Sequence, residues 1–111
     1  MNETNWMKET DWEIFKQIRE QALEQFYRES LTQFQTITEN SGLSLKERYD
    51  KHYEAVIERD QLCANLFDNL CRSKAALQLL QMRHQGLVDA ILLEKLSEEF
   101  RHGTDPSDVF D

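Results

Sequence analysis

Histidines, cysteines and carboxylates are the side chains of this sequence that could bind a metal ion. Glu99 and His102 have Glu-x-x-His spacing, which places both on one face of a helix. A carboxylate-bridged pair of metal ions in a helical bundle needs two such motifs and two further glutamates, and neither His52 nor His84 has a glutamate three residues before it. The two cysteines lack zinc-ligand spacing with any histidine. We therefore expect no metal and no other cofactor.

Motifs of nucleophilic catalysis are also missing from the sequence. It contains no Gly-x-Ser-x-Gly element, and its 3 glycines are isolated, so no glycine-rich phosphate loop can form. The 21 acidic side chains are spread along helical patterns, where we expect them to form a solvated surface. We expect that the protein is not an enzyme.

A cluster of aromatic and polar side chains is more informative. Steps of three and four residues place five side chains along one helical face: Tyr49, His52, Tyr53, Val56 and Arg59. Aromatic residues and arginine are enriched at the energetic centres of protein–protein interfaces. The pattern indicates a dimer interface or partner-binding surface. In the alternative interpretation both tyrosines lie at a helix edge, and Arg59 pairs with Glu58 or Asp60.

The first helix of the chain is expected over residues 10–40. Thr10 and Glu13 form a capping-box pattern at its start. Apolar residues then recur mostly at helical spacing, at Phe15, Ile18, Ala22, Phe26, Leu31, Phe34 and Ile37. Gly42 is expected to end the helix in the left-handed conformation.

A second helix, carrying the aromatic cluster, is expected over residues 45–85. Ser44 and Glu47 form its capping box, and no glycine or proline follows until Gly86. Such a helix would be about 60 Å long, whereas a compact globule of this size is about 35 Å across. Either the helix breaks near Arg72-Ser73-Lys74, or a second copy covers its apolar side. We favour the homodimer.

The remaining chain completes an all-α fold, a helical bundle with one long central helix that dimerisation completes. A short third helix is expected over 89–102, capped by Asp89 and ended by Gly103. Residues 1–9 are expected to form an N-terminal extension, 10–102 a single helical domain, and 103–111 a flexible acidic tail.

Composition narrows the possible partners and location. The 111 residues carry a net charge of −8 without a basic cluster, which argues against nucleic acid and anionic membranes. No apolar run approaches the roughly 20 residues of a membrane span, and the N-terminus does not resemble a signal peptide. Cys63 and Cys71, about 12 Å apart along one helix, are expected to be buried and unbridged. We expect a cytoplasmic protein.

Several of these segments resemble the fluorescence recovery protein family, from about Ala22 to Glu98. The similar stretches are Phe26-Tyr27-Arg28-Glu29-Ser30-Leu31, Arg48-Tyr49-Asp50-Lys51-His52 with Arg59, Leu66-Phe67-Asp68, and Gln85-Gly86-Leu87-Val88. Tyr49 stands where the family has tryptophan, Tyr53 where it has aspartate, and Leu77 and Leu79 where it has docking phenylalanines. The resemblance implies an all-helical dimer that accelerates the relaxation of photoactivated orange carotenoid protein. It also implies that Tyr49, His52 and Arg59 lie near the dimer seam and the partner-binding surface, with Leu77 on the docking head.

Two other functions remain open at this point. The first is a small helical chaperone or adaptor that holds a secretion or flagellar client helix in an apolar groove. The second, based on the net charge of −8 alone, is an acidic inhibitor or antitoxin that mimics nucleic acid.

Overall fold

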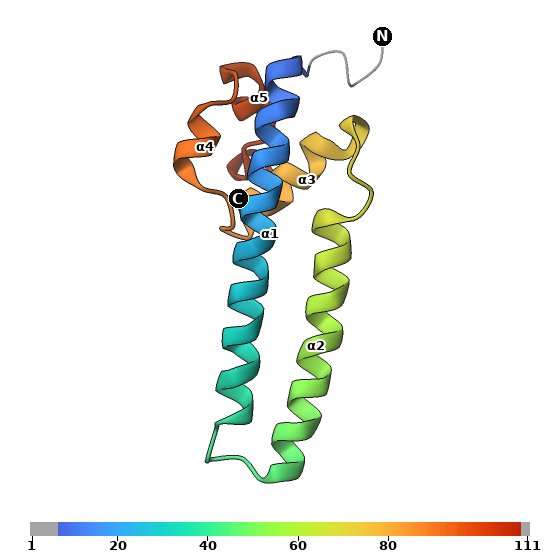
Figure 1. Ribbon diagram of the computed structural model, residues 1–111, viewed down its shortest axis with the longest axis vertical. Coiled ribbons are helices and arrows are strands. Elements are labelled where there is room, and N and C mark those ends of the chain that lie inside the picture. Colours follow the sequence, from blue (N-terminus) through green and yellow to red (C-terminus); the bar gives the residue numbers. More distant parts are fainter. Residues whose placement is uncertain (1–6, 110–111) are drawn as a thin grey trace.

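The protein is an all-α fold built around a long antiparallel hairpin. The computed structural model describes residues 7–109, and every regular element within that range is a helix. Figure 1 shows the hairpin of α1 and α2 running along the length of the molecule, with the other helices gathered at one end. The elements are α1 (Glu9–Thr38), α2 (Leu45–Phe67), α3 (Arg72–His84), α4 (Ala90–Glu94), α5 (Glu98–Gly103) and the 3-10 helix η2 (Pro106–Asp108). The prediction of an all-α fold is confirmed.

The core occupies only one end of an elongated molecule, which measures 56 × 26 × 26 Å. We call this end the head, formed by residues 7–26 and 61–109, and the rest of the hairpin, residues 27–60, the stem. All members of the main hydrophobic cluster lie in the head: Met7, Phe15, Ile18, Ala22, Phe26, Leu66, Phe67, Ala75, Leu79, Met82, Leu87, Leu96 and Phe100. The stem contributes only Ser30 and Ala55 to the buried residues. It is therefore a two-helix projection with little core of its own.

The start and end of α1 differ from the predicted ones. The helix begins at Glu9 after Lys8, which makes no side-chain cap, so the Thr10–Glu13 capping box was wrong. Met7, just before the helix, is buried in the head core and fixes an earlier start. Gly42 does not adopt the left-handed conformation expected of it.

The turn between α1 and α2 is instead shaped by two side chains. The side-chain oxygen of Asn40 accepts a hydrogen bond from the Gly42 amide at 2.9 Å. The predicted capping box of α2 is confirmed: Ser44 Oγ accepts from the Glu47 amide at 3.1 Å, and Glu47 accepts from the Ser44 amide at 2.9 Å.

The predicted continuous helix over 45–85 was wrong, because α2 ends at Phe67 and α3 begins at Arg72. Asp68 is extended and Asn69 has a φ of 60°. The bend lets both α2 and α3 place apolar side chains in the one core beside α1, which a straight 60 Å helix could not do within a single copy. Figure 1 shows α3 turning across α1 instead of continuing along α2. The break, at residues 68–71, lies just before residues 72–74, where the alternative prediction placed it.

The C-terminal part also folds differently from its prediction. Gly86 ends α3 as expected: with a φ of 72° it lets the Leu87 amide reach the Met82 carbonyl at 3.1 Å. The helix predicted over 89–102 is two helices, because Ser97 interrupts it to cap α5.

The ends of the predicted domain need correction too. Residues 7–9 belong to the folded head, while residues 1–6 of the predicted 1–9 extension lie outside the described range. Thr104 is fully buried and donates to the Phe100 carbonyl at 2.8 Å, so the first part of the predicted 103–111 tail packs on the head. Residues 110–111 lie outside the described range.

Candidate protein-binding surface

The stem presents large apolar side chains to solvent along both of its helices. Tyr49 is 75% exposed and Tyr53 is 63% exposed, one helical turn apart on α2. Further exposed apolar side chains on the stem are Tyr27, Leu31, Leu45 and Ile57. The four on α2 recur every fourth residue and therefore share one helical face, and a row of exposed apolar side chains marks a site of interaction more often than isolated ones do.

Four of the six residues predicted for the site meet in one groove. Tyr49, His52, Tyr53 and Val56 line it on α2, with a volume of about 400 Å³. Their spacing of three and four residues was the signal that located them, because it puts side chains on one helical face.

Two further residues of the groove were missed by the sequence analysis. Arg48 lies one position outside the aromatic pattern, and Thr38 comes from the end of α1. Arg48 is fixed by its Nε, which donates to the Leu43 carbonyl at 3.1 Å. Nothing in the local sequence indicates that Thr38 meets α2 here, since only the hairpin turn brings the two together.

His52 is held against the opposite helix of the hairpin. Its imidazole stacks on the Phe34 ring with centroids 5.1 Å apart and an interplanar angle of 16°. Both side chains are half-buried. The contact fixes the position of His52 in the groove that both tyrosines also line.

Arg59 lies outside this groove and points toward α1. Its Nε donates to Ser30 Oγ at 2.8 Å, one Nη donates to the Phe26 carbonyl at 3.4 Å, and its guanidinium lies over the Phe26 ring. The alternative interpretation required an ion pair of Arg59 with Glu58 or Asp60, and no such pair forms among the described residues. Within one copy, Arg59 connects the two helices of the hairpin.

Leu77 is separated from the groove as well. It lies on α3 and is 61% exposed. It borders a second hollow, near the α2–α3 bend, which Asn69, Lys74 and Gln78 also line. The structure therefore does not unite Leu77 with the tyrosines.

Charged side chains occupy the first turns of α2, next in sequence to the groove residues. Lys46 binds the Asp50 carboxylate at 2.6 Å, and this hydrogen bond raises the pKa of Lys46. Glu47 in the capping box has a lowered pKa because the Ser44 amide and hydroxyl donate to its carboxylate and stabilise its charge. The groove thus combines aromatic and apolar side chains with the charged side chain of Arg48, a mixture that protein interfaces commonly show.

Metal-ligating side chains do not converge in the described part of the chain. Residues 7–109 hold no group of three or more His, Cys, Asp or Glu side chains that could bind a metal ion. His102 is exposed and lies 4.0 Å from Glu98, a different residue from the Glu99 of the Glu-x-x-His pattern. Both cysteines are free and half-buried.

Comparisons with known proteins complete this description. Scans against protein-family models, curated proteins and solved structures find no match to the chain. Within residues 7–109, none of the helices has the length and apolar character needed to cross a bilayer.

Proposed function

We propose that this protein is a non-catalytic interaction protein whose stem binds a second copy of the chain and whose assembled stem binds another protein. The observation that carries the proposal is the pair Tyr49 and Tyr53, exposed one turn apart on a regular helix beside the groove. Large aromatic side chains that become buried at the centre of an interface contribute much of its binding energy.

The architecture of the stem supports self-association. Two helices can bury one apolar stripe between them, but enclosing a core around such helices takes a bundle of three or four. The stem buries only Ser30 and Ala55, whereas the head has a full core. A second hairpin laid antiparallel on the first would give four helices and cover the exposed tyrosines.

A pair of stem variants tests this assembly. Tyr49→Ser with Tyr53→Ser should raise the dimer dissociation constant at least about tenfold, because two central aromatic anchors are removed. The matched control is Ile91→Ser, which replaces a side chain that is 69% exposed on α4 in the head. Sedimentation equilibrium over a concentration series measures the constants. A wild-type chain that stays monomeric at millimolar concentration would overturn the self-association.

The resemblance to the fluorescence recovery protein family suggests the second partner. A protein that binds the transition state for the relaxation of orange carotenoid protein more tightly than the photoactivated conformer accelerates the return to the relaxed form. The experiment follows the colour recovery of purified, photoactivated orange carotenoid protein with and without the chain. Acceleration by wild type and Ile91→Ser, but not by the double tyrosine variant, is the expected result. Unchanged recovery with a dimeric wild-type chain would exclude this partner.

A further inference from the structure

We propose that the α2–α3 bend is a hinge through which two copies of the chain exchange residues 72–109, the part of the head that follows the bend. In the exchanged form α2 and α3 join into one helix over residues 45–84, and residues 72–109 of each copy pack on α1 of the other. This interface is separate from the stem and does not depend on the proposed function.

The residues of the bend do not enforce it. Asp68-Asn69-Leu70-Cys71 contains neither glycine nor proline, so local sequence permits a helix to continue. Asn69, with a φ of 60°, is the only residue other than glycine with a positive φ in the described range. Asparagine tolerates this conformation but takes it at a cost that helix formation would remove.

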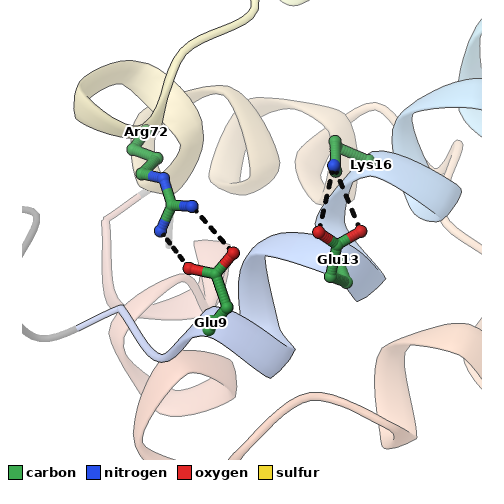
Figure 2. Close-up of polar contacts among 4 residues, drawn as sticks. All are labelled: Glu9, Glu13, Lys16 and Arg72. Carbon is green, nitrogen blue, oxygen red and sulfur yellow. Dashed lines mark hydrogen bonds and ion pairs between the residues drawn. The ribbon is translucent and has the colours of Figure 1, made fainter.

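The contacts that hold the head together run across the bend, and exchange preserves them. Glu9 on α1 pairs with Arg72 on α3 at 2.7 Å (Figure 2). Asp11 on α1 accepts two hydrogen bonds from Ser97, at 2.7 and 2.6 Å. Because each contact joins α1 to a residue beyond the bend, the same contact can form between copies. Domain swapping costs little for this reason.

One polar group beside the bend lacks a hydrogen-bond partner in the bent form. Gln78 Nε2 donates to the Asp68 carbonyl at 2.7 Å, yet the Oε1 of the same amide is buried without a partner. In a continuous helix the Asp68 carbonyl would accept the Arg72 amide instead. Leu70 is 44% exposed at the bend. It would lie where the two joined helices cross, against the same residue of the second copy.

Whether exchange occurs depends on protein concentration, because the free energy gained at the bend is set against the cost of bringing two copies together. The four bend residues gain helical hydrogen bonds and lose the positive φ of Asn69, while Gln78 Nε2 gives up its hydrogen bond to the Asp68 carbonyl. The opposing cost is the association of two copies, which falls as concentration rises.

The first test changes the helical preference of the bend. In the Tyr49→Ser, Tyr53→Ser background, where stem association is weakened, Asn69→Ala favours the helix and Asn69→Gly favours the positive φ. We expect the dimer dissociation constant of Asn69→Ala to be at least about tenfold lower than that of Asn69→Gly, since both hinges contribute. Sedimentation equilibrium measures both constants, and far-UV circular dichroism confirms folding. Equal constants, or an Asn69→Ala variant monomeric at millimolar concentration, would overturn the hinge.

The second test asks whether the head contacts form between copies. Glu9→Arg and Arg72→Glu chains, each also carrying Asn69→Ala and the stem changes, are mixed after unfolding and refolding. Exchanged heterodimers restore opposite charges at both junctions, whereas homodimers place like charges together. We expect native mass spectrometry to show heterodimer at least about threefold above the statistical ratio.

The other ion pair in Figure 2 provides a matched control. It joins Lys16 Nζ to a carboxylate oxygen of Glu13 at 3.1 Å, and both residues belong to α1. Because both partners stay in one copy, mixing Glu13→Lys with Lys16→Glu chains should give the statistical ratio. A statistical ratio for the Glu9 and Arg72 variants as well would exclude exchange, while leaving the stem dimer untouched. If exchange is retained but Tyr49→Ser with Tyr53→Ser leaves the dimer dissociation constant of the otherwise wild-type chain unchanged, the proposed function alone is contradicted.

Discussion

The guanidinium of Arg59 lies over the ring of Phe26, 4.2 Å from its centroid, and so joins α2 to α1 where the stem meets the head. The same guanidinium donates to Ser30 Oγ and to the Phe26 carbonyl. One side chain thus satisfies polar groups of α1 and covers an aromatic ring of the core. This placement explains how a half-buried arginine on the α1-facing side of α2 avoids the cost of a charge without polar partners.

Arg59→Ala is expected to lower the free energy of unfolding by about 2 kcal/mol, because it removes a cation–π contact and charged hydrogen bonds. Arg59→Lys should lose less, since it keeps the charge. Urea unfolding followed by circular dichroism measures both. An Arg59→Ala chain of unchanged stability but weakened self-association would instead place Arg59 in the dimer interface, as the family resemblance implied.

Asp11→Ala is expected to lower the free energy of unfolding by about 3 kcal/mol. Asp11 is buried, and its carboxylate accepts from both the amide and the hydroxyl of Ser97, which in turn caps α5. Without it, two donors of the half-buried Ser97 lose their acceptor. Asp60→Ala, at an exposed position of α2, is the control and should change stability by less than about 0.5 kcal/mol. Equal effects of the two variants would contradict the anchoring role.

Cys71 is expected to react with Ellman's reagent at pH 7.5 at least about tenfold faster than Cys63. The Ser73 hydroxyl, 3.4 Å from the Cys71 sulfur, lowers the pKa of the Cys71 thiol, whereas burial raises the pKa of the Cys63 thiol. The measurement uses the single variants Cys63→Ser and Cys71→Ser. Ser73→Ala should slow the Cys71 reaction. Faster reaction at Cys63 would mean that burial does not protect it.

Ser44→Ala is expected to raise the pKa of Glu47 toward its ordinary value, because the Ser44 hydroxyl that helps to hold it down is lost. A carboxyl whose pKa is lowered by folding stabilises the fold above its unfolded pKa and loses this contribution as pH falls through the folded value. Stability of the wild type should therefore fall more than that of Ser44→Ala between about pH 5 and pH 3. Carboxyl chemical shifts and urea unfolding across this range measure both effects. Ser41→Ala, in the same exposed turn, should titrate like the wild type.

Local sequence determined much of the secondary structure. The Ser44 capping box and the Gly86 stop are where they were predicted, because each depends on residues only a few positions apart. The grouping of Tyr49, His52 and Tyr53 in one groove follows in the same way from the period of the helix. Short-range geometry sufficed for these features.

Only the tertiary structure decided where the helices break and what the polar side chains contact. The bend at Asp68–Cys71 contains no glycine or proline from which it could be predicted. It exists because α2 and α3 share one core beside α1. Likewise, Ser97 ends the predicted third helix early because Asp11, far away in the chain, binds it. Arg59 faces Phe26 only because the hairpin brings α1 alongside α2. Each of these contacts joins residues distant in sequence, and their energy outweighs the local preference for a longer helix.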